Sequence, residues 1–223
     1  AELWAAYQPG LGADNVCMTM SGTNALLNCF MALVNEEDNV LLPEPYFPLY
    51  GPDVTLTGGE PRFYPCTFEN EFIPQLSDLE ALVDENTKAI LYNVPSNPTG
   101  ATLSASQRDD LLEFASRHDL WIISDEVYDQ LILDDDRVHL SPGSLDSALP
   151  VVSVYSFSKV YAMTGWRVGY VVAPTALADV LRKLQEPQVS CPSTISQKAA
   201  EAALTGPREP TASMRTARPG NTA

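Results

Sequence analysis

Short apolar runs typical of β-strands alternate along this chain with longer stretches whose apolar residues recur at helical spacing. The runs lie at residues 16–20, 40–42, 62–64, 88–92, 120–124, 151–155 and 166–173. Helical spacing is found at residues 26–34, 76–83, 104–118, 176–185 and 193–204. Ser104 and Gln107 form a capping-box pattern at the start of the third helical stretch. This alternation predicts an α/β fold in which a mostly parallel sheet carries helices on both faces.

The charge balance narrows the possible partners. The 223 residues include 13 Lys and Arg against 29 Asp and Glu, which gives a formal net charge of −16. A chain this acidic repels phosphate backbones and its basic residues are scattered, so we expect no nucleic acid as a partner. No apolar run reaches the roughly 18 residues needed to cross a bilayer, so we expect no membrane partner. A hydrophobic fraction of 45% excludes a disordered chain.

Cysteine and histidine are too few and too scattered to predict a metal site. The four cysteines contain no pair at ligand spacing, and there are only two histidines. We therefore expect no metal, reduced cysteines and a location in the cytoplasm. The two histidines, His118 and His139, are expected at the surface, one at a helix end and one in a loop.

Polar side chains gather where the predicted strands end, and parallel α/β sheets bind ligands at the carboxyl ends of their strands. The first strand is followed by Ser21-Gly22-Thr23, a turn into a helix whose N-terminal N–H groups and dipole can bind an anion. Later strands are followed by further candidates: Asn97, then Asp125 and Tyr128, then Ser156, Ser158 and Lys159, with Arg167 shortly downstream. Each pattern alone is common in turns and helix caps, but together they predict a shared site.

Lys159 differs in position from the other three lysines of the chain. Lys88 lies at a strand start, and Lys183 and Lys198 lie on amphipathic helices, where a solvated face is the expected role. Only Lys159 follows a strand among serines, where nearby cations and partial burial favour the neutral amine that a Schiff base requires. An amine, an anion site and an acidic partner together are what a pyridoxal phosphate site needs.

The motifs then resemble those of a known family. The string Ser156-Phe157-Ser158-Lys159-Val160-Tyr161-Ala162-Met163-Thr164-Gly165-Trp166-Arg167-Val168-Gly169-Tyr170 is similar to the lysine signature of class I/II aminotransferases, which are fold-type I pyridoxal phosphate enzymes. Four supporting motifs precede this string in the chain and occur in the family's order: Ser21-Gly22-Thr23, Pro43-Glu44-Pro45-Tyr46-Phe47-Pro48, Asn97-Pro98-Thr99-Gly100 and Asp125-Glu126-Val127-Tyr128. Residues 162–167 and 190–197 are most similar to the bacterial aspartate aminotransferase branch. The resemblance runs from about residue 1 to residue 207 and implies the α/β large domain of that fold.

The resemblance implies a role for each matching residue. Lys159 would bind pyridoxal 5'-phosphate as a Schiff base and shuttle a proton at the substrate α-carbon. Asp125 would pair with the pyridine nitrogen and keep it protonated, so that the ring can accept electrons. Asn97 and Tyr128 would donate to the phenolic oxygen of the ring, and Phe47 would stack on it. The implied catalytic residues are thus Lys159, Asp125 and Tyr128.

The phosphate of the cofactor has its own implied residues: Gly22, Thr23, Ser156 and Arg167, the last as a bidentate donor. Ser158 is a further candidate for the phosphate. Glu126, although it lies within one of the matching motifs, is expected to be structural.

Family members are longer than this chain on both sides. Residues 1–205 correspond to the cofactor-binding large domain, truncated at its N-terminus, and the small domain is expected to be largely absent. Residues 2–7 have a helix-like pattern, and residues 206–223, rich in Pro, Thr, Arg and Gly, predict an irregular tail. The resemblance puts the arginine that binds the substrate α-carboxylate outside the chain, and it implies a homodimer for the full-length protein.

The leading hypothesis for function is a pyridoxal phosphate-dependent aminotransferase (transaminase) that acts on an amino acid such as aspartate and on a 2-oxo acid, with activity impaired by truncation. A carbon–sulfur lyase on the same fold would share Lys159 and Asp125, so the cofactor motifs leave that alternative open. A non-catalytic pyridoxal phosphate-binding module, as in some transcription regulators, is the other alternative. The net charge of −16 argues against it, because such regulators bind DNA.

Overall fold

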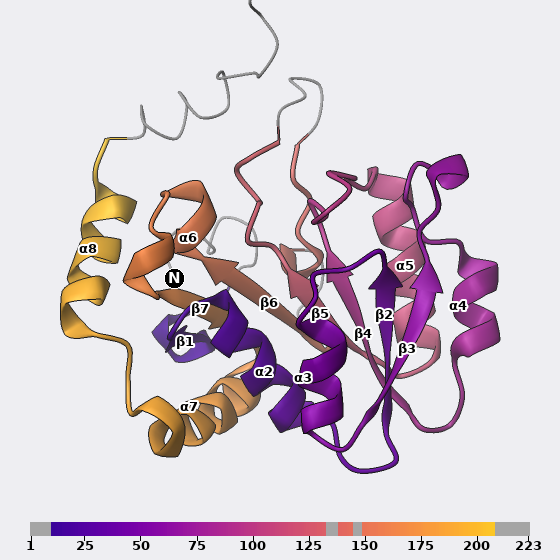
Figure 1. Cartoon of the computed structure of the whole chain (residues 1–223), viewed down its shortest axis with the longest axis horizontal. Helices are drawn as coiled ribbons and strands as arrows, with labels where there is room; N and C mark the ends of the chain where they lie inside the picture. Colours follow the sequence, from indigo (N-terminus) through magenta and orange to yellow (C-terminus); the bar gives the residue numbers. More distant parts are fainter. Residues whose placement is uncertain (1–9, 133–137, 145–148, 208–223) are drawn as a thin grey trace, which may run out of the picture.

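A seven-stranded sheet forms the centre of the computed structural model, which describes residues 10–132, 138–144 and 149–207 (Figure 1). The strands are β1 (Val16–Thr19), β2 (Asn39–Glu44), β3 (Glu60–Pro65), β4 (Thr87–Asn93), β5 (Trp121–Asp125), β6 (Val151–Ser156) and β7 (Gly169–Val172). Their order across the sheet is β1-β7-β6-β5-β4-β2-β3. Neighbours from β6 to β3 are parallel, and β7 is antiparallel to both β6 and β1. The predicted α/β fold with a mostly parallel sheet is confirmed.

This topology brings several strand ends to one edge of the sheet. Because β7 is antiparallel to both of its neighbours, β1 runs in the same direction as β6. The carboxyl ends of β1, β4, β5 and β6 therefore lie at the same edge, together with the amino end of β7. That edge is where ligands bind in sheets of this kind.

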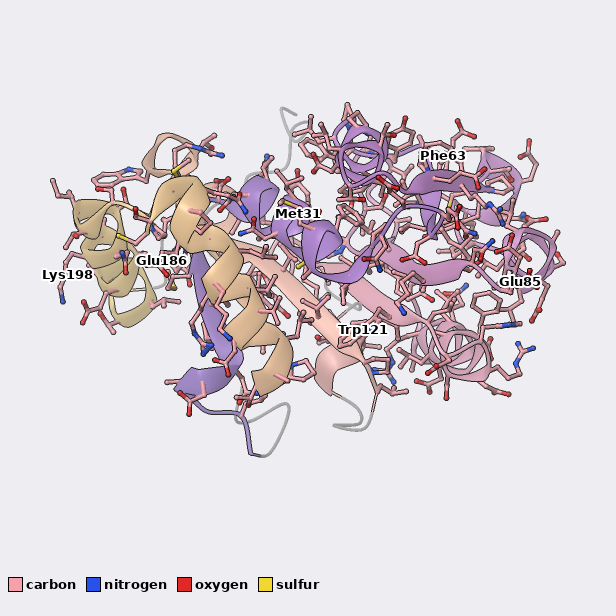
Figure 2. All side chains as sticks on the ribbon, turned by 90° about the horizontal axis from the view of Figure 1, so that it is seen from below. Met31, Phe63, Glu85, Trp121, Glu186 and Lys198 are labelled. Carbon is pink, nitrogen blue, oxygen red and sulfur yellow. The ribbon has the colours of Figure 1, made fainter. Side chains whose placement is uncertain are left out.

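Helices cover both faces of the sheet, as the sequence predicts. One face packs against α2 (Gly22–Leu33), α3 (Tyr50–Leu56) and α7 (Thr175–Val189), and Figure 2 shows α7 next to α2, which carries the labelled Met31. The other face packs against α4 (Leu76–Leu82) and α5 (Ala105–Arg117). Strand residues alternate between the two cores, because successive side chains point to opposite faces: Leu91 and Ile123 face α2, whereas Ile90 and Ile122 face α5. The short α6 (Phe157–Val160) and α8 (Thr194–Thr205) share a separate apolar cluster, against which Tyr170 of β7 packs.

The capping box predicted for α5 is confirmed. The Ser104 hydroxyl accepts from the Gln107 N–H at 3.3 Å, and the Ser104 N–H donates to the Gln107 side chain at 2.9 Å. Two N–H groups at the start of the helix, which have no partner within it, are thereby satisfied.

Two elements differ from the sequence-based expectation. Helix α3 lies within a stretch that proline residues marked as irregular, but Pro52 is in the first turn of the helix, where a missing N–H costs nothing. The strand expected at residues 166–173 begins only at Gly169. A 3₁₀ turn at Thr164–Trp166 precedes it, and Arg167 follows with φ of +50° and donates to the Thr164 carbonyl oxygen at 2.8 Å.

The expectation for the two histidines is right for one and wrong for the other. His118 caps the C-terminus of α5, is partly exposed, and contacts Glu80 at 3.0 Å. The His139 side chain is only 12% exposed, and its Nε2 lies 2.6 Å from a carboxylate oxygen of the fully buried Glu126. A buried carboxylate requires a partner, and this requirement draws His139 into the interior.

The helix predicted at residues 2–7 lies outside the described residues, as does the predicted tail beyond residue 207. Among the residues that the structure describes, no helix is both long and apolar enough to cross a membrane. The same residues contain no group of three or more His, Cys, Asp or Glu side chains placed to hold a metal ion.

Candidate active site

A cavity of about 180 Å³ lies at the sheet edge where the strand ends meet. All ten residues that the sequence analysis singled out line it: Gly22, Thr23, Phe47, Asn97, Asp125, Tyr128, Ser156, Ser158, Lys159 and Arg167. They come from six separate segments of the chain. The fold thus brings together side chains that are up to 145 positions apart in the sequence.

Asp125 is the acidic centre of this cavity. It ends β5, is 4% exposed, and accepts a 2.6 Å hydrogen bond at Oδ2 from the hydroxyl of Tyr50 in α3. Burial raises the pKa of Asp125 to about 6, and the Glu126 charge adds to this rise, whereas the Tyr50 hydrogen bond and the Lys159 charge oppose it. Burial, followed by the Asp125 charge, holds the pKa of Tyr50 well above its usual value, so Tyr50 stays a donor. A buried carboxylate in this setting favours a cation beside it.

Two asparagines tie the end of β4 to the end of β5. The Asn93 side chain donates to the Asp125 carbonyl oxygen at 3.1 Å and accepts from the Asn97 N–H at 2.6 Å. Asn93 is buried and Asn97 is partly exposed. These bonds fix the segment that carries Asn97 against the strand that carries Asp125.

The N-terminus of α2 also lines the cavity. Helix α2 begins at Gly22, and its first N–H groups have no partner within the helix. Space around this turn is tight. A Cβ on Gly22 would meet side-chain atoms of Val127 and Ser156 at 3.2 and 3.3 Å, and a Cβ on Gly169 would lie 2.8 Å from the Ser21 carbonyl carbon. The unpaired N–H groups and the helix dipole make this turn able to bind an anion.

Other possible anion ligands surround the same turn. Ser156 caps α6, and its hydroxyl oxygen accepts from the Ser158 N–H at 3.1 Å, which leaves the hydroxyl proton able to donate. Ser158 is buried, whereas Arg167 is exposed at the mouth of the cavity. A hydroxyl donor and a guanidinium beside a helix N-terminus suit a phosphate group.

Lys159 and two aromatic rings complete the cavity. Lys159 lies in α6, directly after β6, and its Nζ is 5.5 Å from the centre of the Tyr128 ring. Phe47 meets Tyr50 edge-on with ring centres 5.6 Å apart. The site therefore offers an amine, a buried carboxylate, an anion-binding turn and a flat aromatic wall around one space.

Comparison with known proteins identifies the family. Residues 2–218 match the family model described as aminotransferase class I and II. The chain belongs to that family. The class I/II aminotransferase resemblance seen in the sequence, including its aspartate-type branch, is confirmed.

Relatives of this class I/II chain are named for aspartate and aromatic amino acids. It is 42% identical to an aspartate aminotransferase of Pyrococcus abyssi over 189 residues, and this alignment covers 84% of this chain and 48% of that protein. It is 35% identical to the aspartate aminotransferase of Thermotoga maritima over 198 residues, and this alignment covers 89% of this chain and 52% of that protein. A solved aromatic aminotransferase from Pyrococcus horikoshii OT3 matches with a TM-score of 0.91 and 37% identity, over 97% of this chain and 59% of that one. The chain spans about half the length of the curated relatives it matches.

Six other residues line the cavity without a role of their own in the sequence analysis: Ser21, Leu26, Tyr50, Asn93, Val127 and Thr164. Of these, Ser21, Val127 and Thr164 lie within the motifs quoted there. Asn93 directly ends β4, as Asp125 ends β5, so its position at a strand end is a signal that could have identified it. Tyr50 carries no such signal, because it enters the site from the first turn of α3.

Proposed function

We propose that this chain is the pyridoxal 5'-phosphate-binding large domain, residues 1–205, of an aminotransferase that transfers an amino group from an amino acid such as aspartate to a 2-oxo acid. The observation that carries the proposal is the meeting of the Lys159 amine, the buried Asp125 carboxylate and the α2 N-terminus in one cavity. The relatives' names, which refer to aspartate and aromatic aminotransferases, support amino transfer over elimination.

The residues present fit this cofactor. Burial raises the pKa of Asp125 to about 6, so the carboxylate would gain from a protonated pyridine nitrogen placed against it. The N-terminus of α2, with Gly22 and Thr23, suits the phosphate, and Ser156, Ser158 and Arg167 are its further ligands.

Each remaining residue then has a distinct task. Pyridoxal phosphate, when bound, supplies an electron sink for the pair of electrons left at the substrate α-carbon. Lys159 would hold the cofactor through its amine and would then be placed to move a proton at the substrate α-carbon. Asp125 would hold a negative charge for the ring nitrogen, and Asn97 and Tyr128 would donate to the phenolic oxygen. Phe47 would pack against the ring and exclude water.

Further parts of the proposal concern the whole protein. We propose a homodimer in the cytoplasm, with small-molecule amino acid and 2-oxo acid substrates. The arginine that binds the substrate α-carboxylate is proposed to lie outside these 223 residues, because no arginine of this sequence lies in a motif that matches that role.

Borohydride reduction of the cofactor-loaded chain, followed by peptide mapping, tests the assignment. The expected product carries the label on Lys159. Label on Lys88, Lys183 or Lys198 instead would refute it. Addition of amino acid to the loaded chain separates the alternatives: the amine form of the cofactor indicates amino transfer, and released pyruvate indicates a carbon–sulfur lyase.

A further inference from the structure

Glu126 directly follows Asp125 but faces away from the cavity. Glu126 is the first residue after β5, and its N–H still donates to the Val154 carbonyl oxygen of β6 at 2.9 Å, so the strand's alternation of side chains between opposite faces extends to it. Asp125 lines the cavity and contacts Tyr50 of α3, whereas the Glu126 carboxylate contacts the segment at residues 138–144, which lies between β5 and β6. The two adjacent buried carboxylates thus contact different parts of the molecule.

Three residues form what we call the Glu126 clasp: Glu126, His139 and Ser141. His139 Nε2 lies 2.6 Å from Glu126 Oε2, and the Ser141 hydroxyl donates to Oε1 at 2.9 Å. The Glu126 side chain is fully buried, and Ser141 is 4% exposed. The clasp fastens residues 138–144 to the end of β5, at the position next to Asp125.

Within the clasp, each of the two titratable side chains favours the charged form of the other. Burial raises the pKa of Glu126, but the hydrogen bond and charge of His139, with hydrogen bonds from Tyr155 and Ser153, outweigh it and hold that pKa below its usual value. Burial lowers the pKa of His139, but the hydrogen bond and charge of Glu126 and the charge of Asp129 outweigh it and hold that pKa above its usual value. A protonated His139 would neutralise a carboxylate that is otherwise a buried anion without a cation beside it.

This pair is coupled to the candidate active site through charge and through the backbone. The Glu126 charge is one of the causes that raise the pKa of Asp125. The Glu126 carbonyl oxygen accepts from the Asp129 N–H at 3.0 Å, which closes the turn that also carries Tyr128. Loss of the His139 charge would leave the Glu126 anion uncompensated beside Asp125.

We propose that His139 is a positioning residue: by neutralising and holding Glu126, it fixes the turn that presents Asp125 and Tyr128 to the cofactor, and it keeps Asp125 anionic. This inference rests on the proposed function. His139 is not among the residues that line the cavity, and the side chain that it contacts is Glu126, so we infer that it acts through Glu126.

The test measures binding of pyridoxal 5'-phosphate to the 223-residue chain between about pH 5.5 and 8. In the wild type, binding should weaken as the pH falls through the pKa of Asp125, about 6. In His139→Gln the midpoint of this binding profile should rise by about one pH unit, which makes binding at pH 6 about fivefold weaker. The double variant Glu126→Gln/His139→Gln removes the unpaired anion and should return to within about twofold of the wild type, because both partners become neutral.

The other histidine provides a matched control. His118 also contacts a glutamate, Glu80, at 3.0 Å, but both side chains are partly exposed, at 28% and 38%. His118→Gln should leave the midpoint unchanged. A His139→Gln profile that coincides with the wild type, or a double variant no better than His139→Gln, would overturn the inference, even if thermal stability falls.

A second measurement does not depend on the cofactor. With only two histidines in the chain, NMR can follow each imidazole separately. We expect the His139 signal to titrate above about 6.5, and to move down in Glu126→Gln. Titration at or below that value overturns the charged clasp. A wild-type chain that binds no cofactor would refute the proposed function and this inference with it, whereas failure of the inference alone shows only in the variants.

Discussion

Replacing Tyr50 with phenylalanine tests how the protein controls the charge of Asp125. The variant keeps the ring that packs in the core and removes only the hydroxyl that donates to Asp125 Oδ2 at 2.6 Å. Tyr50 is fully buried and Asp125 is 4% exposed, so water does not replace the lost bond. The ionised carboxylate is left with fewer donors, and its protonated form is favoured.

The magnitude follows from the hydrogen bond. A bond to a charged group is worth about 1.5–3 kcal/mol, and about 1.4 kcal/mol corresponds to one pKa unit, so the pKa of Asp125 should rise by about one to two. In the wild type burial already raises it to about 6. The folded state therefore binds this proton more tightly than the unfolded state. The stability of the cofactor-free wild type should fall as pH rises from about 4 to about 6, and in Tyr50→Phe the fall should continue to about 7–8.

Urea unfolding of the cofactor-free chain at a series of pH values measures this difference. The penalty of Tyr50→Phe relative to the wild type should grow by about 1.5–3 kcal/mol between pH 5 and pH 8. Tyr64→Phe is the matched control: Tyr64 is 2% exposed and its hydroxyl donates at 2.7 Å to the Leu91 carbonyl oxygen, a group that does not titrate. Its penalty should not depend on pH over that range.

A second comparison isolates Asp125 from the other buried acids. In an Asp125→Asn background, Tyr50→Phe should lose its pH dependence, because no proton is left to bind at that position. The reasoning is refuted if the Tyr50→Phe penalty is the same at pH 5 and pH 8, or if the pH dependence survives in that background.

Three further predictions concern chemistry and packing. In a longer chain with both flanks, Asp125→Asn should lower the rate of amino transfer by orders of magnitude but the cofactor affinity much less. The pKa of the pyridine nitrogen should fall by several units without the Asp125 charge, so the ring would accept electrons less well. Near wild-type turnover would contradict this role. The 223-residue chain, saturated with pyridoxal phosphate, should form little glutamate from aspartate and 2-oxoglutarate. The proposed reason is that it lacks the arginine that binds the substrate α-carboxylate, and positioning of that kind can lower the barrier by several kcal/mol. Turnover comparable to that of the longer chain would contradict this. Gly169→Ala should destabilise the chain by at least about 2 kcal/mol in urea unfolding, since its Cβ would lie 2.7 Å from the Tyr155 carbonyl oxygen, whereas Gly165→Ala, with no atom within 4 Å, should have little effect.

The sheet and nine of the ten cavity residues were predictable because they depend on local patterns, whereas Phe47 was named only through the family resemblance. Apolar runs marked all seven strands, and the topology of parallel sheets then brought the residues that follow them to one edge. Helix α3 was not predictable in this way, since its prolines resemble those of a loop until the chain is seen to begin a helix at Tyr50. The bond from Tyr50 to Asp125 spans 75 positions, and no periodicity reports a contact of that kind. His139 was missed for the same reason: its place in the interior depends on Glu126.

The two adjacent carboxylates show how packing assigns different tasks to similar residues. Burial alone raises the pKa of both Asp125 and Glu126, yet the pKa of Asp125 stays raised and that of Glu126 is lowered. The difference lies in the partner: Glu126 contacts His139, whose hydrogen bond and charge lower its pKa, whereas the strongest opposing influence on Asp125 is the neutral Tyr50 hydroxyl. Of the two, Asp125 is the carboxylate for which no ion pair is found among the described residues, although the Lys159 charge acts on it, and it faces the cavity. A protonated ring nitrogen in that cavity would supply the cation, which is why the charge distribution supports pyridoxal phosphate as well as the motifs do.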